Sequence, residues 1–217
     1  DIKVKLETTN PTGSIKDRMA WHMVCKAEER GDLMPGATII EVTTGNTGIS
    51  LAMVSASKGY DFIAVMPDSM SVERFRMMQA YGATVKLVHG SMSRAVDEYR
   101  RITSCYRKAW LPRQFDNPDN PDAYEIGFSD EIDFDVDAVV AGVGTGGTLI
   151  GVARLLRRKN PAVRIIGVEP AESAVLSGGS PSEHAIQGIG EGFIPGLIKR
   201  NRHLIDEVIT VSSSDAE

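Results

Sequence analysis

The sequence predicts an α/β protein with two domains, each built on a mostly parallel, twisted sheet flanked by helices. Short runs of β-branched residues alternate with helical segments, which is the order that assembles parallel sheets. Three successive helical segments end at Gly31, Gly59 and Gly82, where left-handed C-caps are expected. Residues 116–135 are rich in Pro, Asn and Asp and lack a long period, which predicts the crossing between the two domains.

The expected elements follow one another with few interruptions. The β-branched and alternating runs predict strands at residues 2–6, 37–42, 61–66, 84–88, 136–141, 163–168 and 208–211. The apolar period and the glycine stops predict helices at residues 14–30, 48–58, 72–81, 91–108 and 148–159. Because a strand is expected at residue 2 and no helix is expected after the last strand, we expect the chain to be part of a longer protein.

Composition and charge exclude several classes of partner. The 217 residues carry a net charge of -5, and their basic side chains are interspersed with acids, which argues against nucleic acid and anionic membranes. No apolar run could span a bilayer and no signal segment opens the chain, so the sequence predicts a cytoplasmic protein. Cys25 and Cys105 lack a CxxC partner, and we expect reduced, mostly buried thiols. The four histidines show no metal-ligand spacing.

A lysine stands in the first turn of an expected helix in "TTNPTGSIKDRMA", residues 8–20. Ser14 is the expected N-cap and Asp17 completes a capping box, which places Lys16 two residues into the helix. A cation there loses about 0.3–1 kcal/mol against the helix dipole. Lys16 is therefore either a surface lysine whose ammonium reaches water, or an amine that the dipole helps to keep neutral as a Schiff-base nucleophile.

The loop "TTGNTG", residues 43–48, joins an expected strand to the next helix. Its two glycines, the amide of Asn46, its hydroxyls and the N–H groups of a helix start suit a bound carboxylate or phosphate. An ordinary turn with a threonine cap uses the same residue types, so both interpretations stay open.

The loop "GVGTGGT", residues 142–148, is the most specific local signal. Its four glycines are expected to have no value for packing, and they suit backbone amides that converge on a phosphate, with Thr145 and Thr148 as added hydroxyl donors. A rival interpretation is a dinucleotide site, because Gly142, Gly144 and Gly147 match G-x-G-x-x-G and Glu169 stands where a ribose-binding acid would lie.

Together these loops resemble a known family, the cysteine synthases or O-acetylserine sulfhydrylases, which are fold type II pyridoxal-phosphate enzymes of the tryptophan synthase β type. The resemblance covers nearly the whole chain. "KLETTNPTGSIKDR" resembles the Schiff-base lysine segment, "TTGNTGISLA" the substrate-carboxylate loop, "QFDNPDNP" a segment with a carboxylate-binding glutamine, and "GVGTGGT" the phosphate loop. "QGIGEGFIP" resembles a stretch at the mouth of the active site. The implied domains are a smaller one at residues 10–118 and a larger one at residues 1–9 and 119–217.

The resemblance implies a role for each matching residue. Lys16 would be the Schiff-base lysine and general base, and Asn46 would hydrogen-bond the ring oxygen of pyridoxal 5'-phosphate. The cofactor phosphate would be held by Gly144, Thr145, Gly146, Gly147 and Thr148. The substrate would be bound by Thr43, Thr44, Gly45, Thr47, Gln114 and Gly188.

The implied activity is β-replacement, which makes L-cysteine from O-acetylserine and sulfide without a metal. The resemblance further implies a homodimer, with serine acetyltransferase as a protein partner. The chain departs from the family at Thr44, where relatives usually carry serine, and in "AYEIGFSDEI", which is shorter than the family segment. The serine that pairs with the pyridine nitrogen in the family has no match in residues 1–217.

Several alternatives stay open at this stage. A cystathionine β-synthase would share every quoted motif and differ in its thiol substrate. A threonine dehydratase or serine racemase usually carries an aromatic residue or histidine where this chain has Thr47. A catalytically silent regulatory module on the same fold, and the dinucleotide-binding module, are alternatives from other classes.

Overall fold

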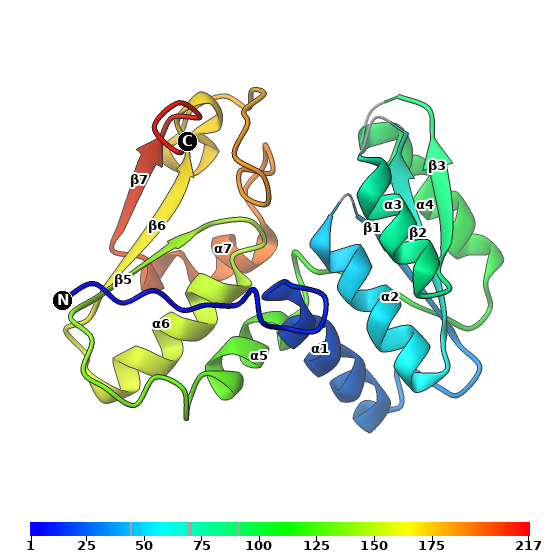
Figure 1. Cartoon of the computed structure of the whole chain (residues 1–217), viewed down its shortest axis with the longest axis horizontal. Helices are drawn as coiled ribbons and strands as arrows, with labels where there is room; N and C mark the ends of the chain where they lie inside the picture. The colour runs from blue at the N-terminus through cyan, green and yellow to red at the C-terminus, as the bar shows by residue number, and fades with distance from the viewer. Residues whose placement is uncertain (44, 69–70, 91) are drawn as a thin grey trace. The chain divides into compact units, whose positions relative to one another are not determined.

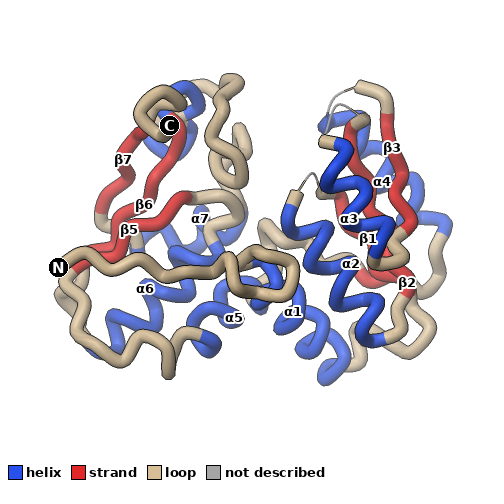
Figure 2. Tube along the Cα trace, in the orientation of Figure 1, coloured by secondary structure: helices blue, strands red, loops and turns tan. Residues whose placement is uncertain are grey.

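The computed structural model describes residues 1–43, 45–68, 71–90 and 92–217. The chain divides into two compact units, Asp1–Arg113 and Gln114–Glu217. Each unit contains its own parallel sheet with helices packed against it (Figures 1 and 2). The predicted fold class is therefore confirmed. Residues 1–9 group with the first compact unit. The predicted domains, residues 10–118 and residues 1–9 with 119–217, stay a prediction.

The first unit has the sheet order β3-β2-β1-β4. Its strands are β1 (Thr38–Val42), β2 (Asp61–Pro67), β3 (Thr84–Val88) and β4 (Ala109–Trp110). Every pairing in this sheet is parallel, and β1 lies in its interior between β2 and β4. The loop that begins at residue 43 therefore follows the carboxyl end of an interior strand. In parallel α/β folds, ligands bind beyond the carboxyl ends of the strands.

The helices of the first unit are α1 (Lys16–Arg30), α2 (Asn46–Lys58), α3 (Val72–Ala80) and α4 (Met92–Cys105). Helix α4 covers one face of the sheet, where Ala95 and Ile102 join Ile40, Ile63 and Val65 in a buried cluster. Helices α1 and α2 pack against each other, and α2 also contacts β1 and β2. Both faces of the central strands are thus buried, as in other parallel sheets that helices cover, and the buried residues of β1 include Glu41.

The second unit has the sheet order β5-β6-β7. Its strands are β5 (Ala138–Gly142), β6 (Arg164–Pro170) and β7 (Glu207–Val211), and its helices are α5 (Asp119–Gly127), α6 (Gly147–Lys159) and α7 (Gly196–Asn201). Short 3-10 turns lie at Ala171–Ser173, Val175–Ser177 and Arg202–Leu204. Helix α6 packs against β5, β6 and α5.

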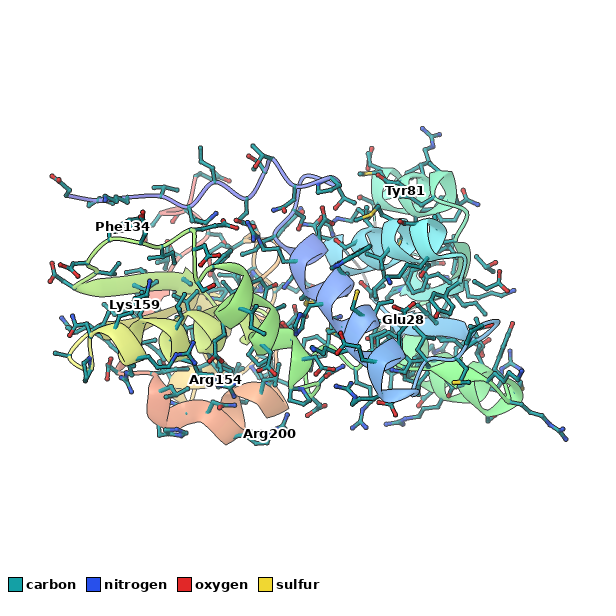
Figure 3. The ribbon with its side chains drawn as sticks, turned by 90° about the horizontal axis from the view of Figure 1, so that it is seen from below. Glu28, Tyr81, Phe134, Arg154, Lys159 and Arg200 are labelled. Atoms are coloured by element: carbon teal, nitrogen blue, oxygen red, sulfur yellow. The ribbon has the colours of Figure 1, made fainter. Side chains whose placement is uncertain are left out.

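Side chains on α6 fix the neighbouring segments of the second unit. Arg154 extends from α6 and donates to Asp122 Oδ1 of α5 at 2.9 Å (Figure 3). Lys159 donates from the end of α6 to the carbonyl of Ile132 at 2.6 Å (Figure 3). These bonds hold α5 and the loop that follows it onto α6, so that the start of α5 has a defined position.

Three predictions about local structure are wrong. Residues 2–6 form no strand with any described strand, and the side chains of Ile2, Val4 and Leu6 are exposed. Helix α5 lies in the stretch 116–135, where no helix was predicted, because Pro121 lies in the first turn, where proline is compatible with a helix. Cys105 is exposed at the end of α4, and Cys25 is only partly buried.

The predicted glycine stops are confirmed in their backbone geometry. Gly31 and Gly59 are the C-caps of α1 and α2, with φ of 75° and 76°. Gly82 has φ of 83° and follows the C-cap of α3, Tyr81. Within the described ranges, no helix is both long and apolar enough to cross a membrane.

Candidate active site

Lys16 is the first residue of α1, one position earlier in the helix than predicted. The predicted capping box is wrong. Ile15 is the N-cap, the Ser14 hydroxyl accepts the N–H of Lys16 at 3.2 Å, and the Asp17 carboxylate turns away from Ser14 toward Thr12. Lys16 is partly buried. The sequence placed the lysine correctly at a helix start, but the groups that fix this helix start are different ones.

Asp17 is the anchor of this helix start. Its buried carboxylate accepts the N–H of Thr12 at 2.7 Å, the Thr12 hydroxyl at 2.5 Å and the Ser50 hydroxyl at 2.6 Å. Thr12 precedes α1, whereas Ser50 lies in the first helical turns of α2. The carboxylate next to Lys16 therefore brings the N-terminal ends of α1 and α2 together, and with them the lysine and the loop at residues 43–48.

Replacing Asp17 by Ala should lower the free energy of unfolding of the full-length protein by about 3 kcal/mol, because hydrogen bonds to a charged group contribute about 1.5–3 kcal/mol each. Urea denaturation measures the change. The matched control is Asp32→Ala, which removes an exposed ion pair with Arg30 and should change stability by less than about 1 kcal/mol. Equal urea midpoints for the two variants would show that the Asp17 network does not hold the helix start.

The loop at residues 43–48 has the local bonds of an ordinary turn, and the binding of a carboxylate or phosphate there stays a prediction. The Thr43 hydroxyl accepts the N–H groups of Gly45 at 3.4 Å and Gly48 at 3.1 Å, so it closes the turn as a threonine cap would. Asn46 is exposed as the first residue of α2, while Thr47 is buried. Thr44 lies outside the described residues.

Gly48 is required by packing rather than by a ligand. A Cβ added there would lie 2.6 Å from Thr43 Cγ2 and 2.7 Å from Met78 Sδ. A larger residue would therefore displace the threonine that closes the loop. Gly45, by contrast, would meet only the flexible end of Arg74, at 3.7 Å.

The loop at residues 142–148 enters α6 through Gly146, which is the N-cap with φ of 86° and carries no side-chain cap among the described residues. The first N–H groups of a helix have no acceptors within the helix, and the helix dipole makes their end positive. Gly144, Thr145, Gly146 and Gly147 are buried, and Thr148 is partly buried. A phosphate group fits this donor set, so the loop can hold the phosphate of pyridoxal 5'-phosphate.

The glycines of this loop do take part in packing, contrary to the prediction. A Cβ at Gly142 would lie 2.8 Å from Ile189 Cγ2, and one at Gly144 would lie 2.6 Å from the carbonyl oxygen of Gly188. A Cβ at Gly146 would overlap Ile198, and one at Gly147 would overlap the Asn120 side chain. Each glycine thus allows a neighbouring segment to approach the loop closely.

Gly188 lies in one of these neighbouring segments. Its carbonyl faces Gly144, and the N–H of Gly190 donates to the carbonyl of Val143 at 3.1 Å. Gly188 has φ of 90°, and a Cβ added there would meet no described atom within 4 Å. The structure therefore brings "QGIGEGFIP" against the phosphate loop, and the role of Gly188 in substrate binding stays a prediction.

Gln114 is buried at the start of the second unit, and several bonds fix its segment. Its carbonyl accepts Asn120 Nδ2 at 2.7 Å. The next carbonyls, of Phe115 and Asp116, accept the N–H of Leu197 at 2.9 Å and Arg200 Nη2 at 2.6 Å; Arg200 is labelled in Figure 3. The sequence analysis did not single out Asn120, because the composition of its stretch predicted only the crossing between the two domains.

Glu169 does not fit the rival dinucleotide interpretation. Its buried carboxylate accepts the N–H groups of Leu176 at 2.7 Å and Ser177 at 2.9 Å, one on each oxygen. Both oxygens therefore hold the turn that follows β6, whereas a ribose-binding acid has to face its ligand.

The structure has parallel sheets, a lysine at the start of α1 and a glycine-rich loop that suits an anion at the start of α6. These features are expected of an enzyme that binds a phosphate-bearing cofactor. Residues 1–217 match the model of a family described as pyridoxal-phosphate dependent enzyme, and the chain belongs to this family. Its relatives within the family include cysteine synthases, which confirms the resemblance seen in the sequence. The chain is 47% identical over 222 residues to a cysteine synthase of a Flavobacterium species, covering 100% of this chain and 72% of that protein.

Solved structures of related enzymes have the same fold as this chain. The crystal structure of cysteine synthase from Entamoeba histolytica has a TM-score of 0.93 at 44% identity, covering 98% of this chain and 64% of that one. The O-acetylserine dependent cystathionine β-synthase from Helicobacter pylori has a TM-score of 0.89 at 39% identity, covering 97% and 70%. The chain thus spans about two thirds of the length of these proteins.

Proposed function

We propose that the protein makes L-cysteine from O-acetylserine and sulfide by pyridoxal-phosphate-dependent β-replacement. The observation that carries the proposal lies in the first unit, where the Asp17 carboxylate holds Lys16 beside the start of α2. The 47% identity to a cysteine synthase supports the choice of substrates. The anion-binding start of α6 supports the choice of cofactor.

The chain's own residues divide the work in this proposal. Lys16 removes the proton from the substrate α-carbon and returns a proton there at the end of the reaction. Thr43, Thr47 and Gln114 bind the substrate carboxylate, and the N–H groups at the start of α6 bind the phosphate. The cofactor, when bound, supplies an electron sink for the α-carbon. Acetate leaves the β-carbon and sulfide takes its place, so that O-acetylserine and HS⁻ give cysteine and acetate.

Asn46 has a supporting role in this proposal. Its amide is exposed at the start of α2 and would donate to the cofactor's ring oxygen. A homodimer, a cytoplasmic location and serine acetyltransferase as a partner belong to the proposal through the family resemblance.

The test is an acceptor assay on the full-length protein. With O-acetylserine and sulfide, cysteine should form only when pyridoxal 5'-phosphate is bound. Replacing sulfide by homocysteine tests the cystathionine β-synthase alternative, for which the Helicobacter pylori relative is a reason. Faster formation of cystathionine than of cysteine would overturn the proposed choice of nucleophile.

Replacing Gln114 by Ala should raise the KM for O-acetylserine at least about tenfold, because loss of a hydrogen bond to a charged carboxylate weakens substrate binding. The cofactor affinity should stay unchanged, and steady-state kinetics with a cofactor titration measures both. Gln79→Ala removes the same side chain from an exposed position of α3 and serves as the control. An unchanged KM would remove Gln114 from the substrate site.

A further inference from the structure

Asn120 is a buried amide that the proposed reaction does not use. It is the second residue of α5 and is fully buried. A side-chain amide has two N–H donors and one acceptor oxygen, and a buried polar group needs partners for them. The partners of Asn120 belong to the two segments of the second unit that carry Gln114 and Thr145.

The Gln114 carbonyl fixes the orientation of this amide. The atom assigned as Asn120 Nδ2 lies 2.7 Å from that carbonyl oxygen. A carbonyl oxygen can only accept, so the amide atom that faces it has to be the nitrogen. The second hydrogen of Nδ2 then points to Thr145 Oγ1 at 3.1 Å, and Thr145 accepts this bond.

The Thr145 hydroxyl is thereby set as a donor. A hydroxyl has two lone pairs and one proton. Its lone pairs receive Asn120 Nδ2–H and the N–H of Gly147, the latter at 3.3 Å. Within the residues that the structure describes, Thr145 has no acceptor for its own proton. The hydroxyl stands in the loop that leads into α6, where a phosphate oxygen would be a charged acceptor.

The oxygen of the amide supports the same conclusion. Asn120 Oδ1 is buried without a hydrogen-bond partner in the described part of the chain, and it faces Gly147 closely. An unpartnered buried oxygen destabilises the folded protein, so packing alone would favour an apolar side chain at this position. An apolar side chain could not donate hydrogen bonds, whereas the Asn120 amide donates one N–H to the Gln114 carbonyl and one to Thr145.

We propose that Asn120 is a positioning residue that orients the Thr145 hydroxyl as a hydrogen-bond donor to the cofactor phosphate. The inference rests on the proposed function, because the phosphate is that of pyridoxal 5'-phosphate. Through the Gln114 carbonyl, the same amide ties the backbone of the substrate segment to the phosphate loop.

The experiment compares cofactor binding by Asn120→Asp and wild type in the full-length apoprotein. A carboxylate cannot donate, and it would accept the Thr145 proton and withdraw it from the phosphate. The dissociation constant for pyridoxal 5'-phosphate should rise about tenfold or more, as for a lost hydrogen bond to a charged group. The dissociation constant for pyridoxal, which has no phosphate, should stay within about twofold. Thermal unfolding verifies that the variants are folded.

A matched control and a double variant separate positioning from charge. Asn117→Asp adds the same charge three residues away and keeps the oxygen that accepts the N–H of Asp119, so cofactor binding should not change. Thr145→Val should weaken binding of pyridoxal 5'-phosphate but not of pyridoxal. Adding Asn120→Asp to Thr145→Val should then have little further effect, because the hydroxyl it acts through is gone.

Three outcomes would overturn the inference. Unchanged binding by Asn120→Asp or by Thr145→Val would show that the hydroxyl proton is not donated to the phosphate. An equal loss for Asn120→Asp with and without Thr145→Val would show that its charge acts on the phosphate directly. If wild type bound neither pyridoxal 5'-phosphate nor pyridoxal, the proposed function itself would be wrong and the inference with it.

Discussion

Replacing Lys16 by Ala should abolish cysteine formation while the protein still binds pyridoxal 5'-phosphate. In the proposed function the amine would both bond to the cofactor and act as the base at the α-carbon, and general-base catalysis alone contributes about 10²–10⁴-fold. The proposed phosphate site, at the start of α6, is built from residues of the other unit. The loss should therefore fall on turnover, with a weaker effect on cofactor binding.

Three measurements test this expectation in the full-length protein. Borohydride should fix the cofactor to the peptide that contains Lys16 in wild type, and should release it unattached from Lys16→Ala. Lys16→Arg should be equally inactive, because a guanidinium stays protonated. The control is Lys26→Ala, which removes an ion pair with Glu29 on the exposed side of the same helix. Normal turnover by Lys16→Ala would show that another residue is the base.

Much of the fold follows from local rules that the sequence states openly. The core strands β1 and β2 lie in the β-branched and apolar runs that predicted them, and the helices α1 and α2 end at glycines whose backbone is left-handed. Residues 2–6 show where such rules fail. Their alternating pattern predicts a strand, yet a strand also needs a partner edge, and no described strand pairs with them. Pairing is a property of distant segments, so the pattern alone could not decide it.

In the candidate site, too, the sequence predicted features that depend on neighbouring residues and missed contacts between distant segments. The sequence identified Lys16 and the loop at residues 142–148, because a cation at a helix start and a run of glycines conflict with ordinary helix and packing preferences. It missed the partners that fix them. Asp17 was expected to cap its own helix, and its contact with Ser50 spans 33 positions of the chain. Asn120 lies in the stretch whose composition predicted the domain crossing, and its contact with Thr145 spans 25 positions of the chain.

Among the residues of the proposed phosphate loop, Gly147 is the one at which we expect a substitution to weaken cofactor binding most. Replacing Gly147 by Val should lower the affinity for pyridoxal 5'-phosphate by about 100-fold or more, because several hydrogen bonds to a charged group are lost together. The added side chain would overlap Asn120 Oδ1 and lie within 2.5 Å of its Cγ. Asn120 is fully buried and cannot move aside without breaking its bonds to the Gln114 carbonyl and to Thr145. Overpacking at such a site costs about 3 kcal/mol of folding free energy.

The cause of the failure can be tested with the smallest possible side chain. Gly147→Ala adds only the Cβ, and its clash should be relieved when Asn120 is also replaced by Ala, since the atoms that the Cβ meets are then absent. The loss of unfolding free energy for the double variant should be smaller than the sum of the two single losses, as urea denaturation can measure. Gly178→Ala measures what backbone strain alone costs, because φ there is 90° and the added Cβ meets no described atom within 4 Å. Additive losses for Gly147 and Asn120 would mean that the glycine is required by the phosphate and not by its neighbour.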